Sequence, residues 1–169
     1  LKFDPRKEFY KIKTYNHLKS FHDSVVKYYN AMSDAEKNGE FREFVAQFRY
    51  LEDRTVYDGP LTIKLLSSPV LVIKEGAEMN SCAGSYVRRI MNGQYILLQI
   101  FDNTDGLPKG EVTRFTFGLF YDATSGLEFD QVKGSCNVQG SNRFKKEVMK
   151  YLEAMDISYR PLRDLKLNA

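Results

Sequence analysis

The sequence predicts an α+β fold: a helical N-terminal half, an antiparallel meander of three to four strands packed against the helices, and a C-terminal helix. Two observations favour this class. Apolar residues recur at helical spacing in the first half, and after Gly93 three β-rich runs follow one another with short turns between them. The length of 169 residues suits one domain. We expect that domain to occupy residues 1–155, followed by a polar, loosely held tail over 156–169.

Two helices are expected before residue 55. Over residues 14–31 the apolar positions fall within one broad arc of a helical wheel, and a histidine lies among them: Leu18, His22, Val25, Val26 and Tyr29. A second helix is expected from Ser33 to about Arg54, because Ser33 and Glu36 have the spacing of a capping box. Its apolar residues are Phe41, Phe44, Val45 and Phe48.

The next segment carries a break, a strand and a short helix. The YDGP run at 57–60 interrupts the chain before an expected strand at 61–66. Ser68 followed by Pro69 is typical of a helix N-terminus and predicts a short helix that ends near Gly76. The VLVI run inside this helix is equally compatible with a strand.

A helix over 82–92, closed by Gly93, precedes the predicted sheet. Its strands are expected at 95–102, 111–122 and 127–134. A final helix follows at 141–155, with Ser141 or Asn142 as its cap. Short connections between successive strands indicate an antiparallel arrangement.

Composition excludes several classes of protein. The net charge of +3 permits contact with nucleic acid but gives no strong basic excess. No run of about 18 apolar residues is present, so we expect no membrane span, and the charged opening segment does not look like a signal peptide. Cys82 and Cys136 make no disulfide framework, which favours the reducing cytoplasm. Metal-ligand spacings and nucleotide-binding glycine loops are absent, so neither a metal nor a cofactor is expected.

The predicted helix at 82–92 combines three chemically useful side chains. Cys82, Tyr86 and Arg89 are spaced i, i+4 and i+7 and therefore share one face, beside an apolar face. A phenol and a guanidinium can hold a phosphate or a carboxylate, and Arg89 with the helix N-terminus is expected to lower the pKa of the Cys82 thiol. The alternative is an ordinary amphipathic helix whose cysteine, tyrosine and arginine border the core.

A second polar cluster, QVKGSCN, lies at the end of the third strand. Strand alternation predicts that Gln131 and Lys133 lie on the same side as the apolar Leu127 and Phe129. Polar groups at the end of an apolar strand face often mark the mouth of a cavity. The alternative is a strand that runs out into solvent, with Asn137 in a turn.

His22 is the remaining candidate for proton transfer. It lies on the apolar arc of the first helix, where a histidine is more often a core residue than a catalytic one. Asp23 is expected to face away from it.

Three segments in this order carry a family resemblance: LKSFHD at 18–23, EGAEMNSCAGSYVRRIMNGQYILLQI at 75–100 and FDQVKGSCN at 129–137. Together they resemble the PcfJ-like family of conjugative plasmids and other mobile elements of bacteria and their phages. Family members commonly carry His directly before the cysteine, where this chain has Ser81. The resemblance implies one composite polar pocket built from three elements, with these motif positions: His22, Cys82, Tyr86, Arg89, Gln131, Gly134 and Asn137.

Two functions are compatible with such a pocket. The first is binding or processing of nucleic acid, including metal-independent RNA cleavage. Its catalytic residues would be His22, Tyr86 and Arg89, and its substrate-binding residues Cys82, Gln131, Lys133 and Asn137. The second is a non-enzymatic adaptor or recognition module with a protein partner in a DNA-transfer or defence assembly, favoured by the missing His. A third, weaker hypothesis is thiol chemistry at Cys82, with Cys136 as the resolving cysteine.

Overall fold

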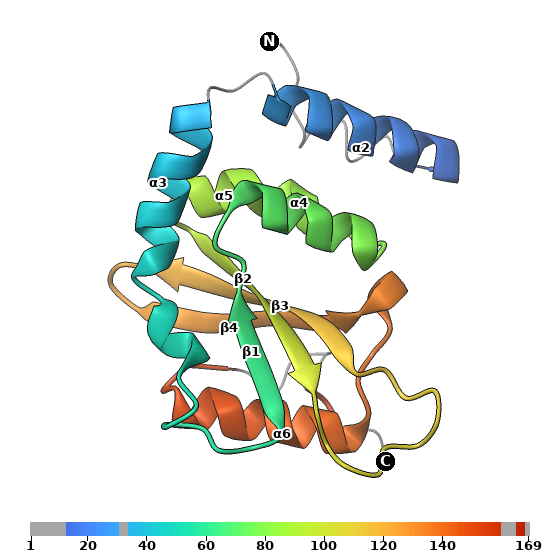
Figure 1. Ribbon diagram of the computed structural model, residues 1–169, viewed down its shortest axis with the longest axis vertical. Coiled ribbons are helices and arrows are strands. Elements are labelled where there is room, and N and C mark those ends of the chain that lie inside the picture. The colour runs from blue at the N-terminus through green and yellow to red at the C-terminus, as the bar shows by residue number, and fades with distance from the viewer. Residues whose placement is uncertain (1–12, 31–33, 160–164, 168–169) are drawn as a thin grey trace.

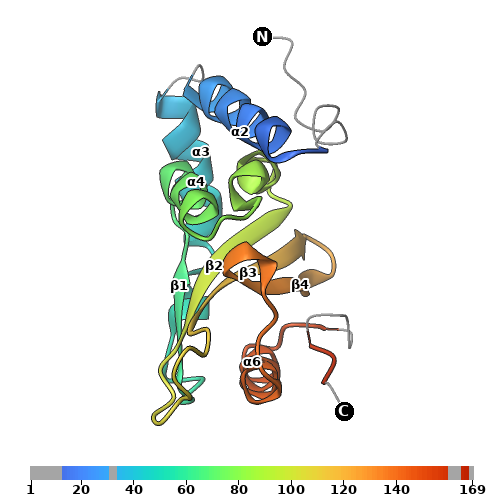
Figure 2. The ribbon, with the colours of Figure 1, turned by 90° about the vertical axis from the view of Figure 1, so that its right-hand side faces the viewer.

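A four-stranded antiparallel sheet forms the centre of the molecule, with the strand order β1-β2-β3-β4. The computed structural model describes residues 13–30, 34–159 and 165–167. Its strands are β1 (Leu61–Leu65), β2 (Tyr95–Asp102), β3 (Arg114–Asp122) and β4 (Gly126–Gly134). Helices cover both faces of the sheet (Figure 1, Figure 2). The α+β class is therefore confirmed, and the last three strands form the predicted meander.

One face of the sheet packs on α6 (Asn142–Ala154), on the side opposite α4 and α5 (Figure 2). The ring of Phe115 on β3 stacks on Phe144 of α6, with ring centroids 3.8 Å apart. The Ser141 side chain caps α6 by accepting a hydrogen bond from the Phe144 N–H at 3.3 Å, which confirms one of the two predicted caps. Stacked aromatic rings bury large apolar areas, so this face supplies much of the core.

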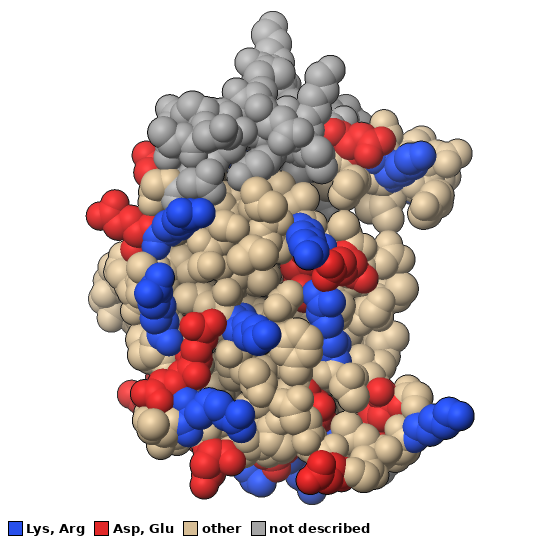
Figure 3. Space-filling model, in the orientation of Figure 1, with Lys and Arg blue, Asp and Glu red and all other residues tan. Residues whose placement is uncertain are grey.

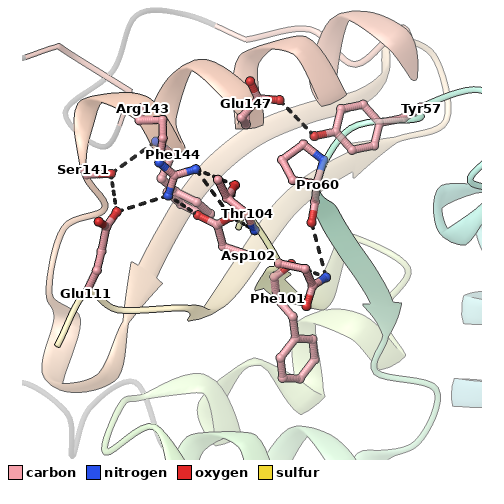
Figure 4. A network of polar contacts seen from close by, with 11 residues as sticks. Tyr57, Pro60, Phe101, Asp102, Thr104, Glu111, Ser141, Arg143, Phe144 and Glu147 are labelled. Atoms are coloured by element: carbon pink, nitrogen blue, oxygen red, sulfur yellow. Dashed lines mark hydrogen bonds and ion pairs between the residues drawn. The ribbon is translucent and has the colours of Figure 1, made fainter. Parts of the chain in front are cut away.

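A buried ion pair fastens α6 to the end of β2, as Figure 4 shows. The Asp102 side chain is fully buried, and its Oδ2 lies 2.5 Å from Nη2 of Arg143. The same guanidinium lies 3.1 Å from Glu111 in the β2–β3 connection, and Glu111 accepts a hydrogen bond from the Ser141 hydroxyl at 2.8 Å. This network therefore joins the N-terminus of α6, the end of β2 and the connection between two strands.

The opposite face carries α4 (Pro69–Glu78), the 3-10 helix η2 (Ala83–Tyr86) and the short α5 (Val87–Met91). Ser68 caps α4, with proline at its first position, as expected. The VLVI run is therefore helical, and the strand alternative is wrong. The helix extends two residues beyond the predicted end at Gly76.

The prediction of one continuous helix over 82–92 is wrong. The N–H and the hydroxyl of Ser85 both donate to the carbonyl of Cys82, at 2.9 and 2.7 Å, and close a 3-10 turn instead of an α-helical one. The backbone of α4 packs closely against this turn. A Cβ atom added at Gly76 would lie 2.7 Å from the Gly84 nitrogen, so the approach requires glycine at position 76.

Two N-terminal helices precede the sheet: α2 (Tyr15–Asn30) lies beyond α4 and α5, and α3 (Asp34–Ala46) runs beside α5 toward the sheet (Figure 1, Figure 2). α3 is shorter than predicted, and the 3-10 helix η1 (Arg49–Glu52) follows it. The predicted apolar face of α3 is confirmed, because Phe41 and Val45 are buried. The apolar face predicted for α2 is not buried at Leu18, which is 42% exposed. Other predicted features fall outside the described residues and side chains: Val25, Val26, Tyr29, Ser33 and Glu36.

A β-bulge in β4 overturns the predicted facing of Gln131 and Lys133. Consecutive β3 residues lie opposite Phe129 and Gln131, which makes Asp130 the extra residue of the bulge. One extra residue reverses the alternation that follows it. Leu127 and Phe129 therefore face α6, whereas Gln131 and Lys133 face η2 and α5, on the side opposite to the prediction.

The described part of the C-terminal segment is held against the sheet. Ile157 and Leu165 are buried, and Ser158 forms a parallel bridge with Glu128 of β4. The carbonyl of Ser158 also accepts a hydrogen bond from the Phe129 N–H at 2.8 Å. The expectation of a loosely held tail is wrong at these residues, because apolar side chains and backbone hydrogen bonds anchor them.

Candidate functional site

Two segments far apart in the sequence, 79–89 and 130–137, lie side by side, and we call their contact the seam. At one end the N–H of Cys136 donates to the carbonyl of Met79 at 2.9 Å. The side-chain amide of Asn80 donates to the Cys136 sulfur at 3.4 Å. Figure 1 shows this end, where the turn after β4 lies beside the C-terminal end of α4. The seam therefore places the Cys82 segment against the end of β4.

At the other end of the seam, one amide joins three elements. Nε2 of Gln131 donates to the hydroxyl of Tyr86 on η2 at 2.8 Å and to the hydroxyl of Tyr95 on β2 at 3.3 Å. The Tyr95 hydroxyl in turn donates to the Asp130 carboxylate at 2.5 Å. Tyr86 and Gln131 therefore meet, as the family resemblance implied, although strand alternation had placed Gln131 on the other face. The bulge makes this possible, because it turns Gln131 toward η2.

Aromatic stacking holds Tyr86 in place above the sheet. Its ring is stacked on Tyr95, with centroids 4.5 Å apart and an interplanar angle of 23°. The guanidinium carbon of Arg89 lies over the Tyr86 ring, 5.6 Å from its centroid, at cation–π distance. Tyr95 lies so close to Gly118 of β3 that any side chain at position 118 would collide with the Tyr95 hydroxyl. Arg89, Tyr86 and Tyr95 thus form a column that rests on the sheet.

Burial keeps both phenols of the column protonated. It raises the pKa of Tyr86, and the nearby Cys82 thiol raises it further. It also raises the pKa of Tyr95 far above its ordinary value, with additional increases from Tyr86 and from Asp130. At neutral pH both groups are therefore hydrogen-bond donors and acceptors, and neither is a base.

The two cysteines behave differently from the prediction. Cys82 is exposed as a residue, but neighbouring atoms desolvate its thiol and raise the thiol pKa, so the expected lowering by Arg89 is wrong. Burial of the thiol is the largest cause of the raised pKa, and the Arg89 guanidinium lies over the Tyr86 ring. Hydrogen bonds involving Asn80 and Ser135 instead lower the pKa of the Cys136 thiol. The more acidic thiol is therefore that of Cys136, which follows β4, and not that of Cys82, which precedes η2.

The predicted residues at the end of β4 lie along the same seam. Lys133 is half-buried, is paired with Thr116 of β3, and shares its face with Gln131. Asn137 and Cys136 are exposed and have left-handed backbone conformations, with φ of 62° and 53°. Asn137 therefore shapes a tight turn, the role most common for asparagine.

His22 lies on α2, and none of the contacts that the structure describes for this side chain joins it to the seam. Its side chain is about half exposed, and Nδ1 lies 3.4 Å from Oδ1 of Asp23. The expectation that Asp23 faces away from His22 is therefore wrong. The neighbouring side chains needed to complete the predicted apolar arc lie outside the described ones.

Sequence reasoning did not single out the buried carboxylate of Glu75 on α4. Its side chain is fully buried and is held by three strand residues. Oε2 accepts hydrogen bonds from Gln99 at 2.6 Å and from Arg114 at 2.5 Å, while Oε1 accepts one from the Thr116 hydroxyl at 2.6 Å. Arg114 also lies 2.7 Å from the half-exposed Glu78. The Glu-Gly pair that opens the 75–100 segment was the available signal.

The family of the chain follows from its sequence. The family model described as PcfJ-like protein matches residues 7–149, which is most of the chain. The chain belongs to the PcfJ-like protein family. No curated protein and no solved structure matches this PcfJ-like chain significantly.

Several segments that carry the PcfJ-like resemblance have structural roles in the seam. Gly76 allows the close approach of α4 to η2, and the Met79 carbonyl accepts from Cys136. Gly134 lies where an added Cβ would be 3.0 Å from a Val112 methyl group. The Ser81 hydroxyl accepts a long hydrogen bond from the N–H of Ala83 at 3.4 Å. Residues of these segments therefore contribute close backbone contacts and hydrogen bonds to this region.

A separate groove of about 820 Å³ lies at the other end of β4. It is lined by Tyr50, by residues of the β3–β4 turn and by 155–159, and it includes none of the predicted site residues. Within the described part of this PcfJ-like chain, no three His, Cys, Asp or Glu side chains are placed to hold a metal ion. None of the described helices has the length and apolarity to cross a membrane.

Proposed function

We propose that this PcfJ-like protein binds nucleic acid at the seam, with Tyr86 and Arg89 contacting a phosphate group. One observation carries the proposal: the Tyr86 hydroxyl accepts its hydrogen bond from Gln131 and so keeps its own hydrogen to donate. Arg89 is exposed and lies over the same ring. A phosphate placed there would receive a charge-assisted hydrogen bond from each side chain.

The charge distribution supports a local contact rather than an extended basic surface. Arg88 and Arg89 are both exposed on α5, and Lys133 lies on the adjoining strand. On the face seen in Figure 3, Lys and Arg alternate with Asp and Glu. With a net charge of +3, the affinity would come from a few donors at the seam and would fall with salt in proportion to the phosphates contacted.

The same observations favour binding over RNA cleavage. Cleavage needs a group that accepts the 2′-hydroxyl proton, ideally with a pKa near the working pH. The pKa values of Tyr86 and Cys82 are raised, and His22 contacts Asp23 on α2. The side chains described at the Tyr86 end of the seam therefore offer hydrogen-bond donors to a phosphate, and the Asp130 carboxylate there already accepts a hydrogen bond from Tyr95.

The test compares Arg89→Ala with Arg42→Ala, which removes another exposed arginine, on α3. Binding of labelled RNA and DNA oligonucleotides is measured by fluorescence anisotropy over a range of salt concentrations. Arg89→Ala should weaken binding and reduce the slope of log K against log salt by about 0.7 for a single strand. Arg42→Ala should leave both unchanged. Absence of binding to any nucleic acid at low ionic strength would contradict the proposal.

The adaptor hypothesis is the second candidate, and exposed apolar residues on α4 favour it. Val70 and Leu71 are 58% and 40% exposed on adjacent positions. Such residues suit contact with a protein partner of a transfer or defence assembly. A double Val70→Ser, Leu71→Ser variant that loses its partner while it retains nucleic-acid binding would support this second role. In either case, family membership is what supports a role in plasmid or phage biology and a bacterial cytoplasmic location.

A further inference from the structure

Phe120 on β3 presents an aromatic ring to solvent beside the seam. It is 41% exposed and is the one exposed phenylalanine among those that the structure describes. Most phenylalanines of β3, β4 and α6 are instead fully buried against one another. A single exposed apolar side chain is common on protein surfaces, so the position of Phe120 beside the seam, and not its exposure alone, makes it a candidate contact.

Phe120 belongs to the same face of the sheet as the Arg89–Tyr86–Tyr95 column. In the β2–β3 register it lies opposite Tyr95, and the two rings meet edge to face with centroids 5.2 Å apart. Tyr95 is completely buried and is hydrogen-bonded to Asp130, so it supports Phe120 rigidly. The exposed ring is therefore pre-organised, and it is separated from Tyr86 by Tyr95 alone.

We propose that the nucleic acid bound at the seam is single-stranded and that one of its bases stacks on Phe120. This inference rests on the proposed function and adds the class of nucleic acid. A duplex keeps its base faces stacked on one another, whereas a single strand can place a base on an aromatic ring while its phosphate contacts a cation. Arg89 contacts one end of the stacked Tyr86–Tyr95 pair and Phe120 contacts Tyr95, so the two side chains offer these two kinds of contact.

The surroundings of Phe120 carry charges of both signs, which disfavours an apolar protein segment as the occupant. Phe120 is paired with Glu128 on β4, and the exposed Arg88 and Arg89 are the charged residues of nearby α5. A single aromatic ring among charged and polar side chains gives too little apolar surface for a hydrophobic protein contact. It does suffice for one base, because every base has a π-face that can stack.

The chain contains no tryptophan, which permits a direct test. Phe120→Trp introduces a single indole, excited selectively at the long-wavelength edge of the tyrosine absorption. Oligothymidylate should quench its fluorescence as it binds, because the stacked base contacts the indole. An abasic oligomer of the same length, which has the phosphates but no bases, should cause no quenching. Tyr15→Trp, on an exposed site of α2, is the matched control and should respond to neither.

Affinity gives a second readout that does not depend on the reporter. Phe120→Ala should weaken binding of oligothymidylate by about tenfold, whereas Phe120→Tyr should bind like the wild type. Binding of the abasic oligomer should be the same in all three proteins. Tyr15→Ala should leave the binding affinity for both oligomers unchanged.

The outcomes separate this inference from the proposed function. If nucleic acid binds and Arg89→Ala weakens it, while Phe120→Trp fluorescence stays constant and duplex binds as well as single strand, the stacking inference is overturned and the proposed function survives. If no nucleic acid binds at low ionic strength, both are overturned, and Phe120 belongs to a surface for a different kind of partner.

Discussion

The amide of Gln131 on β4 donates a hydrogen bond of 2.8 Å to the hydroxyl of Tyr86 on η2, across 45 positions of sequence. The same amide lies 3.3 Å from the Tyr95 hydroxyl, so one side chain orients both phenols of the stacked pair. The phosphate contact proposed for Tyr86 depends on this orientation.

Gln131→Ala should destabilise the protein, because it removes two hydrogen bonds from a half-buried network. The expected loss in the free energy of unfolding is about 1–2 kcal/mol, measured by urea denaturation. Gln47→Ala, at an exposed position after α3, is the control and should change little. Equal stability of the two variants would mean that the seam is not held by this amide.

Glu75→Gln should be destabilising, because it weakens the hydrogen bonds that the buried carboxylate accepts from Arg114, Gln99 and Thr116, although Arg114 keeps its contact with Glu78. A hydrogen bond to a charged group contributes about 1.5–3 kcal/mol, so the expected loss in the free energy of unfolding is about that size. Glu78→Gln removes the other carboxylate bonded to Arg114, but that side chain is 40% exposed, so its effect should be much smaller. Urea denaturation of both variants tests the ranking, and similar losses would contradict it.

Acid should weaken the attachment of α6 to the sheet. Burial disfavours ionised Asp102, but hydrogen bonds from Arg143 and Thr104 outweigh it and lower the Asp102 pKa. A pKa lowered by folding adds stability above the unfolded value of about 3.9. That stability is lost as the pH falls through the folded-state pKa.

The measurement is the free energy of unfolding against pH for the wild type and for Asp102→Asn. The variant should be less stable at neutral pH and should show a shallower decline in acid, because it lacks the titrating carboxylate. Parallel curves for the two proteins would show that Asp102 does not contribute to the acid dependence.

Cys136 should react with iodoacetamide faster than Cys82 at neutral pH. Hydrogen bonds involving Asn80 and Ser135 lower the pKa of the Cys136 thiol, whereas burial raises that of Cys82. The thiolate is the reacting species, so the lower pKa gives the faster rate. Asn80→Ala should slow the labelling of Cys136, followed by peptide mass spectrometry. Preferential labelling of Cys82 would show that the two thiol environments are assigned the wrong way round.

The local sequence pattern was sufficient to predict much of the fold. The spacing of apolar residues and the turn signals predicted all three strands of the meander, and Ser141 was one of two predicted caps of α6. The same reasoning failed at 82–92, because both the N–H and the hydroxyl of Ser85 bond to the Cys82 carbonyl and tighten the turn. Helical periodicity does not reveal which carbonyl a serine side chain will choose.

The sequence by itself determined the α+β class, the family and the candidates Tyr86, Arg89 and Gln131, because these depend on residue type and local spacing. Only the tertiary structure decided how they meet. A single bulge at Asp130 turned Gln131 to the face of the sheet that carries η2, and the absence of a side chain at Gly118 let Tyr95 lie beneath Tyr86. Both effects depend on register between strands, which is set by contacts between distant residues and leaves no periodic signal in the chain.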